Sequence, residues 1–300
     1  MGELAALATA FLWAFTGLLM RPAAAVLPAI RITALEYLVA ATAFVAILLA
    51  TDRLPLLLAL PMPIVGGLAF SAVFGLAAGD TAYIRSLSRL GLGRAFTLST
   101  AGYFVVTVGV SALVLGEGLT PLRLFGAAIM LAGISLIARE DEPTPAAGSD
   151  STSAITIAGT SLRVGLAFAL LAAVCWGLNT VALRVLLENV DVLVALPLRL
   201  TAAAIALNAM SFVRTGPLWV GNERSAVVRI VAAGLLGLGL GSVFYLYAIQ
   251  TAGAAKTAIL SSASPLFAAA FGVLFLKESL TRALAVGTLL VVIGMALVAV

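Results

Sequence analysis

Ten long apolar stretches follow one another along the chain, and they constrain its fold more than any other feature. Each is close to the roughly 20 residues that an α-helix needs to cross a hydrocarbon core of about 30 Å. A transmembrane barrel would instead show segments of about ten residues that alternate between apolar and polar. We therefore expect an all-α integral membrane protein with ten transmembrane helices. The expected spans are residues 4–21, 29–51, 62–84, 94–115, 122–139, 163–183, 192–213, 227–250, 255–276 and 283–300.

The composition excludes several classes of protein. Only 10% of the 300 residues are charged and 63% are apolar, whereas a soluble domain carries about 25% charged residues. The chain has no histidine and a single cysteine, Cys175, so His-based metal sites, Ser/His hydrolases and an intrachain disulfide are excluded. No run of Lys or Arg forms a patch for nucleic acid. We expect no enzyme activity, no cofactor and no metal, with the lipid bilayer and a small-molecule substrate as the partners of a functional monomer.

One polar segment divides the chain into two nearly equal parts. Residues 139–162 are rich in Ser, Thr and Pro and begin with acidic residues, which is the composition of a linker. We expect this linker to be exposed, between a first repeat over residues 1–138 and a second over residues 163–300. Each repeat would contain five spans.

The two halves align with each other. At offsets of 161 to 163 residues the matches include rare residue types, which coincide by chance less often than Ala or Leu. The matched pairs are Trp13/Trp176, Arg21/Arg184, Gly79/Gly241, Tyr83/Tyr245, Gly91/Gly253, Ser99/Ser261, Glu117/Glu278, Thr120/Thr281, Gly126/Gly287 and Gly133/Gly294. Because five is odd, the second copy crosses the membrane in the opposite direction. Inverted repeats of this kind place a binding site near the midplane between the copies and permit alternating access.

The residues that carry the repeat also carry a family resemblance. The strings LGEGLT (115–120) and LKESLT (276–281), with GDTAYIRSLSRLGLGRA (79–95) and ILSSASPLFAAAFGVLFLKE (259–278) before them, resemble the EamA-type branch of the drug/metabolite transporter superfamily. The first half departs from the S-P-L-F string, since Tyr103 stands near the position that Pro265 has in the second. The resemblance covers nearly the whole chain except the linker. It implies ten helices in two inverted repeats around a central cavity, and export of amino acids, as in exporters of the YddG type, of other metabolites, or of toxic compounds.

Two ionisable residues lie inside expected spans. Glu36 and Arg199 are repeat mates, each about 10 Å below the start of its span. Intramembrane charges are costly and usually functional. Because the copies enter from opposite faces, the pair suits a zwitterionic amino acid, with its carboxylate on Arg199 and its ammonium on Glu36. A structural salt bridge, or side chains that reach vestibule water, remains an alternative.

Polar and aromatic residues in the other helices complete the predicted substrate site. Trp13 and Thr16 share a helical face, as do Trp176 and Asn179, and these faces either line the cavity or pack between helices. Tyrosines near span ends also serve as interfacial anchors, and Ser groups also bond between helices. A proline that frees a backbone carbonyl predicts a break facing substrate at SSASP (261–265). The predicted site residues are Trp13, Thr16, Glu36, Tyr83, Ser99, Tyr103, Trp176, Asn179, Arg199, Tyr245, Ser261 and Ser264.

Two further pairs are interpreted as structural. Gly126/Gly133 and Gly287/Gly294 are spaced seven apart, so they would let spans 5 and 10 pack closely. Glu117 and Glu278 lie between spans, where an exposed turn or a first-turn helix acid is the simplest interpretation. Neither span 1 nor span 6 contains an acid, so Glu36 or Asp80 must serve if transport is coupled to an ion; otherwise transport is uncoupled exchange down a gradient.

The distribution of Lys and Arg and the family resemblance predict opposite orientations of the protein in the membrane. The face that the N-terminus shares would hold four Lys/Arg, namely Arg53, Arg123, Arg184 and Lys256. The opposite face would hold twelve: Arg21, Arg31, Arg85, Arg89, Arg94, Arg139, Arg163, Arg214, Arg224, Arg229, Lys277 and Arg282. The positive-inside rule would place both termini outside, whereas the resemblance implies termini inside a bacterial inner membrane, which we adopt.

The sequence thus predicts an exporter of amino acids, aromatic ones included, or of similar small metabolites. The alternative within the same class is an exporter of drugs or cationic toxins, against which an arginine in the cavity argues. A channel would need a continuous polar stripe, and the polar residues cluster within each repeat instead.

Overall fold

A computed structural model describes the chain except for residues 21–22, 24–26, 91, 119, 139–153, 217–223, 277–280 and 300. Every regular element among the described residues is helical. The helices are α1 (Gly2–Met20), α2 (Ala29–Ala50), α3 (Leu54–Leu58), α4 (Met62–Ser71), α5 (Gly79–Leu90), α6 (Leu92–Val110), α7 (Pro121–Ala138), α8 (Ala154–Leu186), α9 (Val192–Thr215), α10 (Arg224–Ala233), α11 (Ser242–Ala252), α12 (Ala254–Ser261), α13 (Ser264–Leu276) and α14 (Arg282–Ala299), with π-helical segments η2 (Ala72–Ala78), η3 (Ser111–Leu115) and η4 (Gly234–Gly241).

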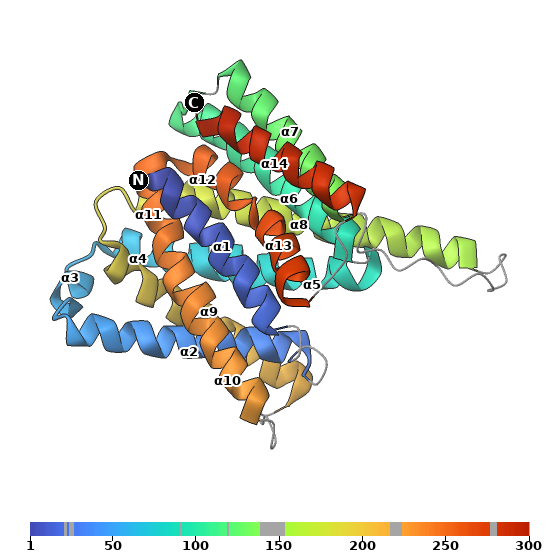
Figure 1. Ribbon diagram of the computed structural model, residues 1–300. Coiled ribbons are helices and arrows are strands. Elements are labelled where there is room, and N and C mark those ends of the chain that lie inside the picture. Colours follow the sequence, from blue (N-terminus) through green and yellow to red (C-terminus); the bar gives the residue numbers. More distant parts are fainter. Residues whose placement is uncertain are drawn as a thin grey trace.

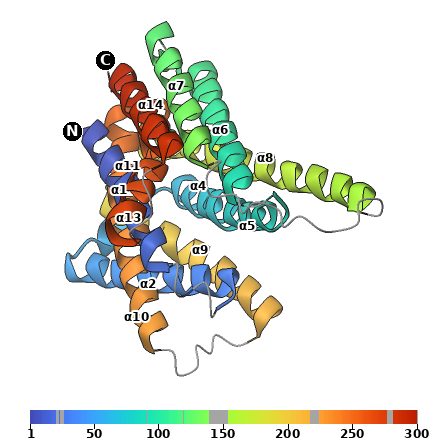
Figure 2. The ribbon, with the colours of Figure 1, turned by 45° about the vertical axis from the view of Figure 1, so that its right-hand side comes forward.

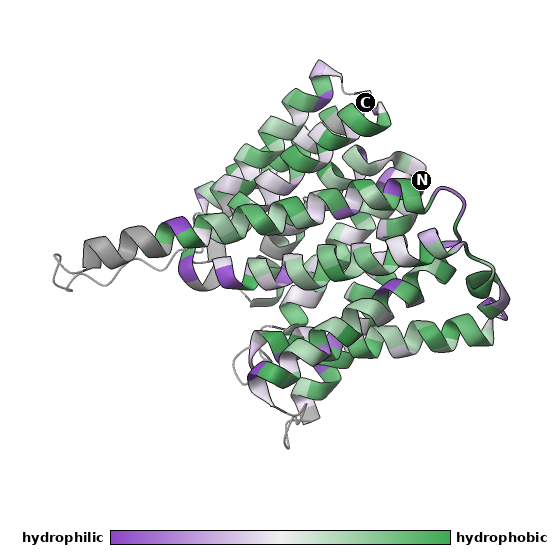
Figure 3. Ribbon diagram, turned by 180° about the vertical axis from the view of Figure 1, so that it is seen from behind, coloured by the Kyte–Doolittle hydropathy of each residue, from purple (hydrophilic) through white to green (hydrophobic). Residues whose placement is uncertain are grey.

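Most expected spans are present as membrane-length helices. Among the described residues, seven helices are long and apolar enough to cross a membrane, and Pro121–Leu136 and Ala285–Gly294 are shorter apolar helices. Most of the ribbon in Figure 3 is coloured as hydrophobic. Expected span 9 (255–276) is not continuous, because α12 ends at Ser261 and α13 begins at Ser264. The interruption lies at the predicted SSASP break, and the ten expected spans are not all found as membrane-length helices among the described residues.

The start of α8 also differs from the expected linker. This helix begins at Ala154 rather than near residue 163, so the predicted linker of 139–162 gives way to helix over its last part. A helix that is already nucleated extends at little cost through residues such as Ala and Ile. The remainder of that linker, 139–153, lies outside the described residues.

The helices assemble into two bundles that each combine both halves of the sequence. In the α1 bundle, α1 packs against α10, η4, α11, α12 and α13, and in the α8 bundle, α8 packs against α4, η2, α5 and α6. Helices α2 and α9 pack on each other and contact both bundles. Figure 1 and Figure 2 show α2 and α10 at the end of the molecule opposite α7 and α14, and α8 extending away from the rest.

Helices α7 and α14 form a close pair on the other side of the bundles. They lie side by side in both views (Figures 1 and 2). A Cβ atom added to Gly133 would lie 2.6 Å from the carbonyl oxygen of Gly287, and one added to Gly294 would lie 2.5 Å from that of Gly126. The predicted close packing of spans 5 and 10 through these four glycines is confirmed.

The π-helical segments η2 and η4 occupy repeat-related positions. Each interrupts a membrane-length helix, α4–η2–α5 and α10–η4–α11, and η2 shifted by 162 residues falls on η4. π-Helical turns are rare and occur often at functional sites, because the extra residue redirects the side chains that follow. Ser242 is the first residue after η4, Asp80 is the second residue after η2, and the two are repeat mates.

Candidate functional site

A cavity of about 350 Å³ lies between the α1 bundle, the α8 bundle and the α2–α9 pair. Its volume is at the lower end of the roughly 300–1,000 Å³ typical of small-molecule sites. Residues from both halves line it: Trp13, Tyr37, Leu76, Asp80, Thr100, Tyr103, Trp176, Asn179, Thr180, Leu196, Arg199, Leu200, Leu238, Ser242, Tyr245, Leu246, Ser261, Ser262 and Ser264. The lining combines leucines with aromatic rings, hydroxyls, one carboxylate and one guanidinium.

Arg199 contributes the positive charge. It lies two residues after Pro197, which stands inside α9, and the side chain is buried, with only 4% of the residue exposed. One terminal nitrogen donates to Asn179 Oδ1 at 3.2 Å, while the Nε–H is buried without a hydrogen-bond partner. An unsatisfied buried donor is costly, so this Nε–H can gain free energy from an acceptor on a bound molecule.

Asp80 contributes the negative charge. Its Oδ1 accepts from Trp176 Nε1 at 3.0 Å, and its Oδ2 accepts from the Tyr37 hydroxyl at 3.4 Å. Two neutral donors orient the carboxylate without neutralising it. Among the described residues, no Lys or Arg nitrogen is recorded within 4.0 Å of this group.

Three hydroxyl groups connect the two bundles across the cavity. Tyr103 and Tyr245 lie 3.0 Å apart at their hydroxyl oxygens, and Thr180 Oγ1 lies 2.7 Å from the Tyr245 oxygen. Tyr103 belongs to α6 and Thr180 to α8, whereas Tyr245 belongs to α11 of the α1 bundle. This hydroxyl cluster is therefore a polar contact between the two bundles.

Aromatic rings form matching walls on the two sides. Trp13 contacts Tyr245 with ring centroids 5.2 Å apart, and Tyr83 contacts Trp176 at 5.4 Å. Each contact pairs a first-helix tryptophan of one half with a third-helix tyrosine of the other. Aromatic walls of this kind favour apolar or aromatic ligand groups.

Eight of the twelve predicted site residues line the cavity. These are Trp13, Tyr103, Trp176, Asn179, Arg199, Tyr245, Ser261 and Ser264. Of the other four, Tyr83 contacts Trp176 with tilted rings, Ser99 donates to the carbonyl of Ala169 at 3.3 Å, and Thr16 donates to the carbonyl of Trp13 at 2.8 Å. Ser99 and Thr16 thus bond to helix carbonyls, which is the interhelical or local role that the sequence left open.

Glu36 is placed differently from its expected role. It precedes the cavity-lining Tyr37 on α2 but is not itself part of the lining. The backbone of Glu36 faces Gly234, where an added Cβ would lie 2.8 Å from the Glu36 carbonyl oxygen. No ion pair between Glu36 and Arg199 is recorded in the described part of the chain. The cavity acid is Asp80 instead.

The sequence prediction of the site omitted Asp80 and several neutral lining residues. Asp80 stands inside expected span 62–84, so its charge at membrane depth was the available signal. Ser262 lies in the predicted SSASP break, and Thr100 and Ser242 could have been found from the repeat as the mates of Ser262 and Asp80. Tyr37 and Thr180 carry no signal of this kind. Among the described residues no three His, Cys, Asp or Glu side chains gather as metal ligands.

Comparison with known proteins assigns the family. The EamA-like transporter family matches residues 1–139 and 163–300. The chain belongs to this family. An uncharacterized transporter from Archaeoglobus fulgidus is 28% identical over 232 residues, which cover 77% of this chain and 74% of the relative.

The fold of this EamA-like transporter also recurs in a solved structure. A crystal structure of a protein has a TM-score of 0.79 at 22% identity, and the match covers 99% of this chain and 95% of that one. The chain is therefore a multi-pass membrane transporter of the drug/metabolite superfamily with a known helical architecture.

Proposed function

We propose that the protein exports amino acids or similar small zwitterionic metabolites by alternating access. The observation that carries the proposal is that one cavity holds both Arg199, with an unsatisfied Nε–H, and Asp80, whose carboxylate has no cationic partner among the described residues. An α-carboxylate would accept from Arg199, and an α-ammonium would donate to Asp80. This assignment replaces Glu36, which does not line the cavity, with Asp80.

The uncharged part of the cavity lining favours substrates with amphiphilic side chains. Leu76, Leu238, Leu246 and the rings of Trp13 and Trp176 surround the charged pair. A ligand with one positive and one negative group balances the fixed charges, so neither remains uncompensated in a low-dielectric site. The small volume of the cavity favours aliphatic or aromatic amino acids over larger compounds.

Export of cationic toxic compounds is the alternative that the site also suggests. Asp80 beside tryptophan and tyrosine rings is suited to an amphiphilic cation. Arg199 in the same cavity opposes it, because a like charge would then lie near the ligand without compensation.

The test is counterflow into proteoliposomes loaded with the twenty amino acids and read out by mass. Selective exchange of some amino acids would support the proposal and name the substrate class. If no amino acid exchanges with folding verified, while cationic dyes are transported, the toxic-compound alternative replaces it.

We further propose that the protein acts as a monomer in a bacterial inner membrane with both termini in the cytoplasm. The family supports this orientation, and the distribution of Lys and Arg opposes it. A fluorescence-quenching topology assay on terminal tags distinguishes the two.

A further inference from the structure

Glu117 joins the two bundles at the face of the protein that carries the N-terminus. It follows η3, the last turn of the crossing that α6 begins in the α8 bundle. Its Oε1 accepts from the backbone N–H of Ala254 and its Oε2 from that of Ala255, both at 2.9 Å. These N–H groups belong to the first turn of α12, in the α1 bundle. Glu117 thus caps a helix of the other half rather than lying in an exposed turn or in the first turn of its own following helix.

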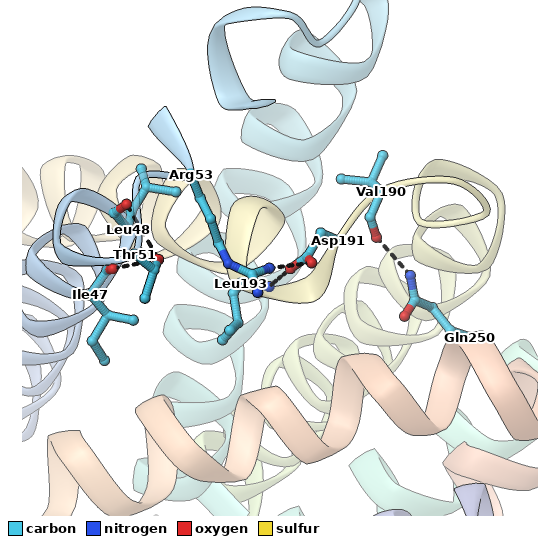
Figure 4. A network of polar contacts seen from close by, with 8 residues as sticks. All are labelled: Ile47, Leu48, Thr51, Arg53, Val190, Asp191, Leu193 and Gln250. Atoms are coloured by element: carbon cyan, nitrogen blue, oxygen red, sulfur yellow. Dashed lines mark hydrogen bonds and ion pairs between the residues drawn. The ribbon is translucent and has the colours of Figure 1, made fainter. Parts of the chain in front are cut away.

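A second contact joins the bundles at the same face. Gln250 Nε2 of α11 donates to the carbonyls of Leu187 and Val190 at 2.6 and 2.8 Å. Both acceptors follow the end of α8. Figure 4 shows the Gln250–Val190 bond beside the ion pair of Arg53 and Asp191, which fastens α9 to the loop after α2. The N-terminal face is therefore closed by contacts that cross between bundles.

The Glu117 carboxylate has an alternative partner within its own bundle. Arg184 Nε of α8 lies 3.8 Å from Glu117 Oε1. If α12 moved away, the α8 bundle would carry Glu117 and Arg184 together, so the carboxylate would keep a cationic partner. A pocket of about 290 Å³, lined by Glu117, Arg123, Arg184 and Lys256, gives the side chain room to turn.

Gly253 allows the Glu117 carboxylate to come close to the start of α12. Its φ of +88° is left-handed backbone that favours glycine, and an added Cβ would lie 2.8 Å from Glu117 Oε1. The carboxylate therefore reaches the helix terminus only because no side chain stands at residue 253. A charge-assisted bond to a helix N-terminus is stronger than one between neutral groups, which suits a contact that holds two bundles together.

We propose that Glu117 is a positioning residue of the transport cycle: it latches the N-terminal face closed through α12, and it transfers to Arg184 when this face opens. The proposal rests on the proposed alternating access and adds the residue that controls one of its two states. It requires that loss of the carboxylate changes the balance of conformations, and not only the stability of the fold.

The test measures distances at both faces in lipid nanodiscs without substrate, by double electron–electron resonance on a Cys175→Ala background. Spin labels at Leu4→Cys and Val185→Cys, both exposed, report the N-terminal face, and labels at Leu162→Cys and Val228→Cys report the opposite face. Each pair joins the α1 bundle to the α8 bundle. We expect Glu117→Ala to lengthen the N-terminal pair and shorten the opposite pair.

Matched variants separate a latch from a merely structural contact. Glu3→Ala removes the 3.0 Å contact with Lys256, which lies within the α1 bundle, and should leave both distance distributions unchanged. Arg184→Gln should lower the open population by removing the partner of the released carboxylate. Glu117→Gln serves if the alanine variant does not fold, because its amide can accept from only one of the two N–H groups.

Unchanged distances in a folded Glu117 variant would overturn the latch, because the contacts of Gln250 would then keep the N-terminal face closed without the Glu117 carboxylate. Equal broadening at both faces would also overturn it, because a general loss of packing has no direction. These distances need no substrate, so failure of amino-acid counterflow in the wild type would reject the proposed function and leave the latch standing.

Discussion

Asp80 and Ser242 occupy repeat-related positions in the two halves, and both line the central cavity within two residues of the end of a π-helical segment. The duplicated backbone is therefore symmetric at the site, while the chemistry on it is not. One half presents a carboxylate where the other presents a hydroxyl, and Arg199 has Glu36 as its mate outside the lining. A pseudosymmetric cavity with unlike charges can orient a substrate that itself has two different ends.

Arg199→Gln should weaken binding of substrates that carry a carboxylate. Loss of a hydrogen bond to a charged group costs about 1.5–3 kcal/mol, or about 10- to 100-fold in affinity. Isothermal titration in detergent with an amino acid and with the matching decarboxylated amine measures the effect. The amine should bind the variant no more weakly than it binds the wild type; an equal loss for both ligands would contradict carboxylate recognition by Arg199.

Asp80→Asn should weaken binding of the same amino acid through its ammonium group by a similar factor of about 10 to 100. Glu36→Gln is the matched control, because Glu36 also lies within the membrane but not in the lining. Deaminated analogues should be insensitive to Asp80→Asn. A larger loss from Glu36→Gln than from Asp80→Asn would restore Glu36 as the ammonium partner.

Gly79→Ala should disturb the site through a neighbour. Its Cβ would lie 2.7 Å from Trp176 Nε1, the nitrogen that donates to Asp80. The indole must shift, so affinity should fall while the protein stays folded. Gly241→Ala at the repeat-related position places a Cβ 3.3 Å from Trp13 and should have the smaller effect in the same titration. The reverse order would show that the Trp176–Asp80 bond does not position the acid for substrate.

Gly133→Leu should destabilise the protein without changing its substrate affinity per folded molecule. Its side chain would meet the carbonyl oxygen of Gly287 and the side chain of Val291, and overpacking of this kind costs about 1–3 kcal/mol. Thermal unfolding in detergent measures the loss. Gly17→Ala, where nothing lies within 4 Å of the added Cβ, should leave the melting temperature close to that of the wild type.

Much of the architecture could be predicted from the sequence because membranes allow few choices. Apolar length alone locates helices, and the matches of Trp13 with Trp176 and of Gly133 with Gly294 indicated the two related halves. The break in span 9 was also predicted, from Ser and Pro at its centre. The π-helical segments were not predicted; their Gly75 and Gly237 pack against Asn179 and Thr16 of other helices, and such tertiary contacts cannot be read from the local sequence.

The site was harder to predict than the fold. Counted from the start of each span, Glu36 and Arg199 have the same expected depth in the membrane. Which of these side chains enters the cavity depends on the rotation of each helix about its axis, and helix packing determines that rotation. Glu117 shows the same limit. Its position between spans indicated a turn, whereas its partners at Ala254 and Ala255 come from more than a hundred residues away. Contacts of this kind depend on tertiary structure alone.

The glycine contacts between α7 and α14 also have a consequence for motion. The helices approach so closely at Gly133 and Gly294 that an added Cβ atom would lie 2.6 or 2.5 Å from a carbonyl oxygen of the other helix, and packing this close opposes sliding of one helix along the other. This pair lies beside both bundles rather than within either of them. Under the proposed alternating access, we therefore expect the bundles to rotate about this pair while the separation of α7 from α14 stays constant.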